Sequence, residues 1–371
     1  MAERILITGG AGFIGSHLAD ELLAAGYQVR VLDNLTEQVH GRDPSRPTYV
    51  SPEVEFIAGD IRDSEAVSRS LGNVDAVVHL AARVGVGQSM YAIDEYVDAN
   101  ERGTAVLLQA LIDRPVRKLM VASSMSIYGE GLYANGGGAP REDVERTTEQ
   151  LQQHRWDPVD EQGRALRALP TPESKRPQLA SVYALSKYVQ ERMCLVAGRA
   201  YGMPTMALRF FNVYGPRQAL SNPYTGVLAI FASRLLNRKR PVIFEDGLQQ
   251  RDFVHVKDVT RACRLALERD CTDAVVNIGS GEACTIRQVA ERLALALGRN
   301  DIGPEITGQF RAGDIRHCFA DISEARRLLG YEPSVKLDDG LKELTGWLAD
   351  QAAVDRFDEA RSELLRRGLS A

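Results

Sequence analysis

Arg4-Ile-Leu-Ile-Thr-Gly-Gly-Ala-Gly-Phe-Ile-Gly-Ser-His-Leu-Ala-Asp20 stands near the start of the chain and combines an apolar run with four glycines. The apolar residues 5–7 predict a buried strand, and the glycines lead from it into a helix. At such a junction the first helical N–H groups lack partners, the helix dipole favours an anion, and glycine lets a ligand approach the backbone. The segment therefore predicts a site for a nucleotide pyrophosphate.

The residues that follow this segment strengthen that prediction. Gly26 ends the helix, 28–32 reads as a second strand, and Asp33 comes about 20 residues after the glycines. A carboxylate at this spacing accepts hydrogen bonds from the ribose hydroxyls of NAD. Neither Asn34 nor Leu35 carries a cation for the 2′-phosphate of NADP. The pattern favours NAD, and an acidic residue that merely ends a strand is the alternative.

Strands and helices continue to alternate up to about residue 210. This alternation is typical of a parallel sheet that helices cover on both faces. The sequence thus predicts an α/β fold with a Rossmann-type, doubly wound parallel sheet. Further strands are expected over 54–60, 74–83, 118–124 and 205–210, and helices over 96–111 and 181–200.

Several chemically useful residues follow these expected strands. Ligands lie at the carboxyl ends of the strands in doubly wound sheets, so we expect Asp60 near the adenine. The small side chains of Ala81 and Ala82 would let a cofactor lie against the backbone, and Ser124 arrives at the same sheet edge. Asn100, inside a helix, is either solvated or clamps the backbone.

The second half of the chain differs in composition. Between 131 and 180 the sequence predicts a long loop, and loops of this length are usually functional or mobile. It is a lid, a subunit contact or a tolerated surface insertion. Beyond it, short apolar runs and frequent proline and glycine predict a smaller C-terminal α+β substrate domain. We expect an NAD-binding domain over 1–211, a substrate domain mainly over 212–350 with some segments returning to the first domain, and a helical tail over 351–371 that docks on the core or on a partner chain.

Composition limits the possible partners. The chain has 371 residues, of which 44% are hydrophobic, enough for one large or two modest domains. A net charge of −5 from 45 basic and 50 acidic residues gives no general attraction to nucleic acid or anionic lipid. No charged and apolar leader precedes the first strand, and no apolar stretch has the length of a membrane span. We expect a cytoplasmic protein with neither nucleic-acid nor membrane partners.

The five cysteines form no C-x-x-C pair and have no histidine-rich companion segment. Neither a zinc site nor a disulfide framework is indicated, so we expect reduced thiols and no metal site. His79, within the fourth expected strand, is predicted to be a packed side chain rather than a ligand.

Tyr183-Ala-Leu-Ser-Lys187 places a phenol and an ammonium four residues apart on one helical face. The ordinary pKa of tyrosine is about 10, and a nearby lysine cation and a cationic nicotinamide would both favour the phenolate. The pair therefore predicts a base that works at neutral pH. Ser124 could hydrogen-bond the same substrate hydroxyl and relay or steady its proton.

Taken together, the motifs resemble the extended short-chain dehydrogenase/reductase family, specifically its nucleotide-sugar epimerases and dehydratases. The resemblance runs from about residue 4 to residue 347, interrupted by 131–180. It implies a tightly held NAD, a Rossmann domain, a C-terminal domain for the sugar nucleotide, and usually a homodimer. The motifs are Thr8-Gly-Gly-Ala-Gly-Phe-Ile-Gly15, Asp60, Ser124, Tyr183-x-x-x-Lys187 and Arg209-Phe-Phe-Asn-Val-Tyr-Gly-Pro216.

The resemblance also implies which residues bind ligands. Asn212 would reach the diphosphate or the sugar, Arg251 would neutralise a phosphate, and Arg311 with Asp314 would hold phosphate and ribose. Guanidinium groups suit this task because they bind phosphate oxygens in pairs, although surface salt bridges are an alternative role. The expected catalytic residues are Ser124, Tyr183 and Lys187, and the expected cofactor contacts are Gly9, Gly12, Phe13, Ile14, Gly15, Asp33, Asn34, Asp60, Ile61, Ala81, Ala82, Asn100, Ser123, Tyr183 and Lys187.

The residues after Ser124 help to choose the reaction. In the 4,6-dehydratases of the family that the chain resembles, the residues at this position are Thr-Asp-Glu. Here they are Ser124-Met125-Ser126, so both carboxyl groups are missing. Elimination is therefore disfavoured, as is glutamate-assisted decarboxylation. A 4-epimerase needs only Tyr183 to take a sugar proton while hydride passes to NAD⁺ and returns to the other face of a 4-keto intermediate. A dehydratase or reductase of the same family is the alternative, and an NAD-binding sensor or scaffold is the non-enzyme alternative.

Two features bear on the substrate. Cys318 matches a position that gates pocket size in similar hexose 4-epimerases, and the simpler alternative is a buried thiol packed in a core. The segment 218–226 and the insertion resemble epimerases of dTDP-linked 6-deoxysugars. The expected substrate is therefore a dTDP-linked 6-deoxyhexose or a UDP-hexose.

Overall fold

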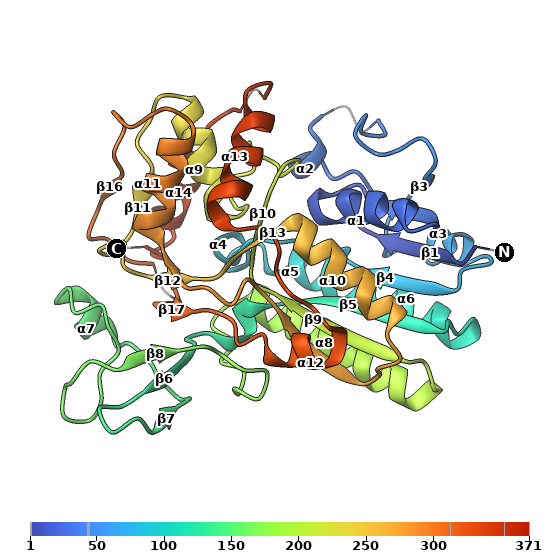
Figure 1. Ribbon diagram of the computed structural model, residues 1–371, viewed down its shortest axis with the longest axis horizontal. Helices are drawn as coiled ribbons and strands as arrows, with labels where there is room; N and C mark the ends of the chain where they lie inside the picture. The colour runs from blue at the N-terminus through green and yellow to red at the C-terminus, as the bar shows by residue number, and fades with distance from the viewer. Residues whose placement is uncertain (1, 43–44, 312, 352, 371) are drawn as a thin grey trace.

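A computed structural model describes residues 2–42, 45–311, 313–351 and 353–370. Its centre is a sheet of seven parallel strands (Figure 1). The strands are β1 (Arg4–Thr8), β2 (Gln28–Asp33), β3 (Glu55–Ala58), β4 (Ala76–His79), β5 (Lys118–Ser124), β9 (Thr205–Phe210) and β14 (Ala274–Ile278). Their order across the sheet is β14-β9-β5-β4-β1-β2-β3. The order changes direction between β1 and β4, which confirms the predicted Rossmann-type sheet.

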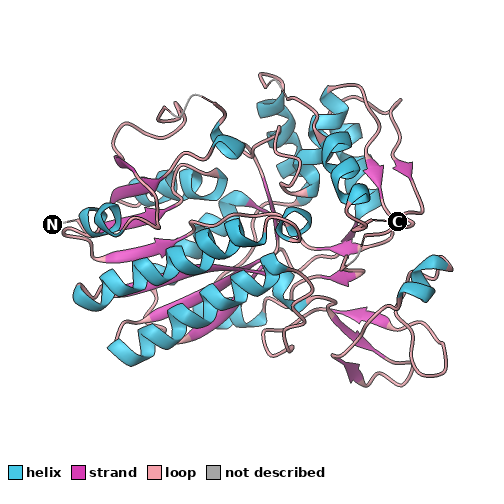
Figure 2. Cartoon of the chain, turned by 180° about the vertical axis from the view of Figure 1, so that it is seen from behind, coloured by secondary structure: helices cyan, strands magenta, loops and turns pink. Residues whose placement is uncertain are grey.

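Both faces of the sheet are buried because successive side chains of a strand point to opposite sides. In β1, Ile5 and Ile7 join one hydrophobic cluster, whereas Leu6 joins the other. Helices cover both faces, as the views from front and back show (Figures 1 and 2). The first face carries α1 (Phe13–Ala24), α10 (Val256–Glu268) and α12 (Ser323–Leu329), and the second carries α3 (Ser64–Ser70), α6 (Gly103–Asp113) and α8 (Val182–Tyr201).

The expected elements hold with local differences. The fourth strand is shorter than expected, so residues 80–85 form a loop at the sheet edge. The helix expected over 96–111 consists of a short α-helix, a π-helical segment and α6. The seventh strand, β14, comes from the C-terminal half of the chain and pairs with β9. The short helical segments of this half of the molecule are α2 (Glu37–His40), α4 (Val86–Ser89), α5 (Ile93–Tyr96), the π-helix Val97–Arg102 and the 3₁₀ helix Met125–Tyr128.

A second group of elements, here called the C-terminal lobe, has its own hydrophobic core. The lobe's helices are α9 (Val227–Leu236), α11 (Ile286–Ala296) and α13 (Leu337–Leu348). Its short strands pair as β10 (Asn212–Tyr214) with β13 (Phe253–His255), β11 (Val242–Ile243) with β16 (Glu305–Ile306), and β12 (Gln250–Arg251) with β15 (Cys284–Thr285) and β17 (His317–Cys318).

The insertion 131–180 is not the long loop that its composition predicts. It forms a three-stranded antiparallel sheet that projects from the molecule at the lower left of Figure 1. The buried side chains of Tyr133, Val144 and Leu166 form a small hydrophobic cluster within it. Its elements are β6 (Leu132–Ala134), β7 (Pro140–Arg141), α7 (Thr148–Gln152) and β8 (Arg167–Leu169).

A buried ion cluster joins this insertion to the C-terminal lobe. Arg146 lies 3.1 Å from Glu130 and 2.7 Å from Glu245, and Glu245 lies 3.1 Å from Arg316. Arg146 also donates a hydrogen bond of 2.8 Å to the carbonyl of Asp314. The insertion is thus anchored by buried charge pairs that solvent and salt screen only weakly.

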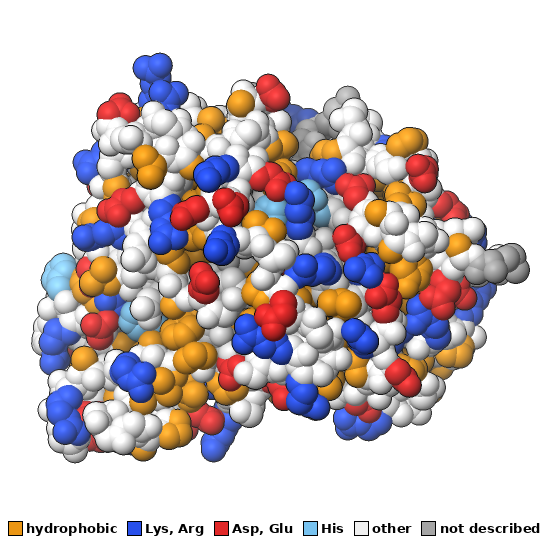
Figure 3. Space-filling model, viewed as in Figure 1, with side chains coloured by type: hydrophobic (Ala, Val, Ile, Leu, Met, Phe, Trp, Pro, Cys, Tyr) orange, Lys and Arg blue, Asp and Glu red, His pale blue; other side chains and the backbone are white. Residues whose placement is uncertain are grey.

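The tail forms the helix α14 (Phe357–Arg366), whose Ala360 and Leu364 are buried against this same chain. Docking on the core was one of its two expected roles. Acidic and basic side chains are interspersed over the face drawn in Figure 3. Within the described ranges, no helix combines the length and the apolar character that crossing a membrane requires.

Candidate active site

A cavity of about 650 Å³ lies at the carboxyl ends of the central strands and extends to the C-terminal lobe. It is lined by every predicted site residue except Asn100 and Cys318. Its walls come from the β1–α1 turn, the ends of β2, β4 and β5, the start of α8, the C-terminal lobe and the tail. Of the insertion 131–180, only its last residue, Ala180, is among the lining residues, so a lid made by the insertion finds no support here.

The glycine turn at one end of the cavity has no room for side chains. A Cβ added at Gly9, whose φ is +71°, would lie 2.8 Å from the backbone nitrogen of Ala81. A Cβ at Gly15 would lie 2.4 Å from the carbonyl oxygen of Gly9. Helix α1 begins directly after Gly12 with no side-chain cap. These residues fit a dinucleotide pyrophosphate, which would meet uncapped helical N–H groups.

Two carboxylates stand beside this turn. Asp33, at the end of β2, accepts hydrogen bonds from the N–H groups of Ala11 at 3.0 Å and Leu35 at 2.9 Å. Its side chain is thereby fixed while lone pairs remain for a ligand. Asp60 accepts a hydrogen bond from the Asn34 amide at 2.9 Å. Hydrogen bonds from Arg62 hold the pKa of Asp60 well below its usual value, so this carboxylate stays ionised.

Asn100 lies beneath the cavity rather than in its wall. Its side chain is buried and makes hydrogen bonds with both the N–H and the carbonyl of Arg83, at 2.7 and 3.1 Å. It is a backbone clamp, one of its two expected roles, and its predicted contact with the cofactor finds no support in the cavity wall. His79 is packed as predicted, hydrogen-bonded to Thr8 at 2.7 Å and Thr104 at 2.9 Å.

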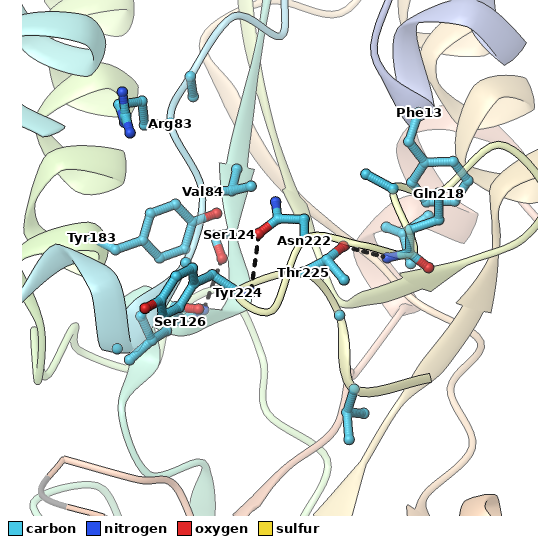
Figure 4. Close-up of a pocket in the computed structure, with 18 of the residues that line it drawn as sticks. Phe13, Arg83, Val84, Ser124, Ser126, Tyr183, Gln218, Asn222, Tyr224 and Thr225 are labelled. Atoms are coloured by element: carbon cyan, nitrogen blue, oxygen red, sulfur yellow. Dashed lines mark hydrogen bonds between the residues drawn. The ribbon is translucent and has the colours of Figure 1, made fainter. Parts of the chain in front are cut away.

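The predicted catalytic residues Ser124 and Tyr183 meet further along the same edge of the sheet. Ser124 ends β5, and its hydroxyl accepts a hydrogen bond of 3.1 Å from the N–H of Ser126. Tyr183 stands in the first turn of α8, and its N–H donates to the Ser89 hydroxyl at 3.0 Å. In Figure 4 the phenol of Tyr183 points toward Ser124. The two hydroxyls can therefore address one substrate oxygen.

The protonation of this pair differs from the sequence prediction. Burial raises the pKa of Tyr183 above its ordinary value, and only the interaction with Ser124 opposes the rise. Lys187 is not among the groups that shift the pKa of Tyr183, and its ammonium instead donates to Gln190 at 2.7 Å. Burial also lowers the pKa of Lys187 to about 8. A lower pKa of Tyr183 therefore requires a further positive charge, which an oxidised nicotinamide carries.

The C-terminal lobe supplies the predicted substrate residues. Asn212 lines the cavity, and its buried Oδ1 has no hydrogen-bond partner among the described residues. Arg251 donates to the carbonyl of Arg316 at 3.1 Å. Arg311 pairs with Asp314 at 2.8 Å and lies over the Phe244 ring, 4.6 Å from its centroid. The predicted arginines thus lie at one end of the cavity, partly engaged by protein groups.

Cys318 does not line the cavity. Its side chain is 1% exposed, belongs to the main hydrophobic core and has its sulfur 3.8 Å from the Thr171 hydroxyl. The predicted substrate gate is therefore corrected to the alternative of a packed thiol. The physical reason is that the insertion covers this position, with Gly131 directly against Cys318.

Sequence reasoning missed several lining residues. Arg83 follows the two predicted alanines and pairs with Glu95 at 2.7 Å. Tyr224, in the segment 218–226, hydrogen-bonds the hydroxyl of Tyr91. Their proximity to predicted motifs was the only available signal. The tail also lines the cavity through Phe357, Ala360, Arg361, Leu364 and Leu369.

The glycine turn, the carboxylates beside it and the serine–tyrosine pair beyond it define a dinucleotide-binding protein of the Rossmann class. The model of the NAD dependent epimerase/dehydratase family matches residues 5–155 and 162–279. The chain belongs to this family, and NAD is its cofactor.

Individual relatives show which enzymes of this family the chain is similar to. The chain is 34% identical to dTDP-L-rhamnose 4-epimerase of Burkholderia thailandensis over 356 residues, covering 94% of this chain and 96% of the relative. The structure of UDP-glucose 4-epimerase from Thermotoga maritima with UDP-glucose is 33% identical, with a TM-score of 0.76 and coverage of 93% and 98%. A dTDP-glucose 4,6-dehydratase from Streptomyces venezuelae with NAD bound is 29% identical, with a TM-score of 0.77 and coverage of 94% and 97%. Relatives thus include both epimerases and dehydratases.

Proposed function

We propose that this protein is an NAD-dependent nucleotide-sugar 4-epimerase. The first substrate to test is a dTDP-linked 6-deoxyhexose such as dTDP-L-rhamnose, and the second is a UDP-hexose. The similarity to dTDP-L-rhamnose 4-epimerase over most of both chains supports this order. The proposal assigns catalysis to Ser124, Tyr183 and Lys187.

One observation carries the choice of epimerisation over dehydration. The acidic residues among the described lining residues are Asp33, Asp60 and Asp314. The first two lie at the cofactor end, and the third pairs with Arg311. The positions after Ser124 hold Met125 and Ser126, so the acid and base that elimination of water needs are missing beside the reacting carbon.

Bound NAD supplies the acceptor and donor of the hydride. Tyr183 accepts the proton of the sugar 4-hydroxyl as that carbon is oxidised, and it returns the proton when the carbon is reduced from the opposite face. Ser124 holds the same oxygen by a hydrogen bond and keeps it in line with the phenol. We assign Lys187 a supporting role through its positive charge once NAD and substrate are bound, since within the chain alone it donates to Gln190 and does not shift the pKa of Tyr183.

The cavity wall near Tyr183 also favours a neutral sugar. Arg83 is paired with Glu95, so its guanidinium is engaged and does not offer a free cation to a uronic acid. Val84, drawn near Tyr183 in Figure 4, and Met90 add apolar surface to the wall. Such a surface suits the methyl group of a 6-deoxysugar and does not hold the keto intermediate in one orientation.

A panel of UDP-, dTDP- and GDP-sugars incubated with the purified protein tests the proposal, with products identified by NMR. We expect a C4 epimer and no net change in nicotinamide absorbance. A keto sugar from dTDP-glucose would show a dehydratase, and stoichiometric consumption of NADPH would show a reductase. Absence of turnover with retained NAD would favour a sensor or scaffold. We also propose a homodimer, to be tested by light scattering.

A further inference from the structure

The tail helix α14 bridges the two halves of the molecule beside the cavity. On the Rossmann side, a Cβ added at Gly87 would meet both methyl groups of Leu364 at 3.4 Å. The Arg367 guanidinium lies over the Tyr91 ring, 4.4 Å from its centroid. The helix therefore rests on the segment that holds Tyr183 through Ser89.

On the other side, α14 and the residues around it are fixed to the C-terminal lobe. Asp358 lies 3.1 Å from Arg234, whose guanidinium also stands 4.9 Å from the centroid of the Phe357 ring. After the helix, Ser370 forms a β-bridge with Arg311, one of the predicted substrate residues. The tail is thus part of the frame around the substrate end of the cavity.

The tail also contributes a cation, Arg361, that the sequence motifs did not indicate. Arg361 lines the cavity and donates one hydrogen bond of 2.6 Å to the Gln309 side chain. Its Nε is buried and has no hydrogen-bond partner within the described ranges. A buried donor without a partner costs free energy, so its place at a cavity wall points to a ligand acceptor.

The charges at this end of the cavity suit a dianion. Arg251, Arg311 and Arg361 all line the wall, and Asp314 is the carboxylate beside them. Asp314 pairs with Arg311, and the Arg251 guanidinium is partly engaged by backbone carbonyls. The arginine with an unpartnered buried donor is therefore the one on the tail.

We propose that α14 is part of the substrate site and that Arg361 donates to the diphosphate of the nucleotide sugar. This inference rests on the proposed function. The apolar side chains of Phe357 and Leu364, on the same helix, also line the cavity. The matched family model ends at residue 279, so this contact lies in a part of the chain outside the match.

Calorimetric titration of the NAD-loaded protein with dTDP, UDP and dTMP tests this inference without turnover. Arg361→Gln should weaken dTDP binding by about 10- to 100-fold, the loss expected for hydrogen bonds to a charged group. Binding of dTMP should weaken less. Arg361→Lys should recover part of the affinity because it restores the charge without the planar fork. Arg366→Gln is the matched control, since Arg366 is exposed on the same helix and pairs with Glu363.

The outcomes separate the two proposals. Unchanged dTDP affinity in Arg361→Gln, at an unchanged melting temperature, overturns the role of Arg361. Equal losses for dTDP and dTMP also overturn it, because the contact would then not be to the diphosphate. Failure of the unaltered protein to bind either dTDP or UDP would instead overturn the proposed function.

Discussion

The two ends of the cavity are built differently. At the cofactor end, a seven-residue glycine segment and the last residues of β2 supply the wall, and backbone hydrogen bonds fix Asp33 in place. At the substrate end, the wall comes from the C-terminal lobe and the tail. There Arg251 and Arg311 both pair with the carboxylate of Asp314. Sheet topology preforms the first end, whereas contacts between distant segments hold the second.

Substitution of Tyr183, which lies where the two ends of the cavity meet, should have the largest effect on activity. Tyr183→Phe removes the proposed base and should lower epimerisation by about 10²- to 10⁴-fold, the usual contribution of general acid–base catalysis. NAD content and melting temperature should stay unchanged. The NMR assay of the product measures the loss, and Tyr201→Phe, at the exposed end of α8, is the control. Unchanged turnover would show that another group is the base.

Substitution of Arg146 tests whether the buried ion cluster between the insertion and the C-terminal lobe stabilises the fold. Arg146→Met leaves Glu245 buried without one of its charge partners and should lower the free energy of unfolding by about 3–5 kcal/mol. Urea unfolding measures this change. The control Arg141→Met removes an exposed pair with Glu161 in the same insertion and should cost less than about 1 kcal/mol. Equal effects of the two variants would contradict a structural role for the buried cluster.

Substitution of Gly15 tests whether the cofactor end of the cavity binds NAD independently of the substrate end. In Gly15→Ala the new Cβ would clash with the carbonyl of Gly9, so the turn must shift and NAD affinity should fall about 10- to 100-fold. Binding of dTDP, measured by calorimetry, should change much less. Gly346→Ala, where the added Cβ meets nothing within 4 Å, is the control in another helix. Similar losses of both ligands would mean that the two ends are not independent.

The pH dependence of activity tests the role of Lys187, which lies between the two ends of the cavity. Its pKa is lowered to about 8, so its positive charge is present below that pH and is lost as pH rises through it. Since the proposed function gives this charge a role when NAD and substrate are bound, activity should fall above about pH 8. Lys187→Met should remove this falling limb and lower activity at pH 7 by about tenfold, with exposed Lys342→Met as control. A limb that persists in the variant would exclude Lys187 as its source.

The cofactor end was predictable because its residues are contiguous or end consecutive strands. Gly9 to Gly15 and Asp33 carry their roles in local spacing alone. The tail was not predictable in the same way, since Phe357, Ala360 and Leu364 show only that a helix has one apolar face. Which surface that face meets depends on the whole fold.

Two errors have related physical causes. The insertion has strands of two or three residues, too short to show alternation, so its sheet could not be recognised from periodicity. Gly131 and Thr171, the residues on either side of this small sheet, cover Cys318, which is why its position in a motif did not predict its surroundings. The effect of Lys187 on the pKa of Tyr183 was also overestimated, because burial dominates that pKa and the lysine ammonium donates to Gln190, one turn beyond it.

The placement of β14 affects how the chain can be divided. Until residues 274–278 are made, β9 has an unpaired edge, and an open edge of this kind can pair with another molecule. A fragment that stops soon after β9 would therefore be prone to aggregate. Chimaeras that exchange substrate specificity between relatives should keep β14 with the N-terminal sheet and exchange only the surrounding segments.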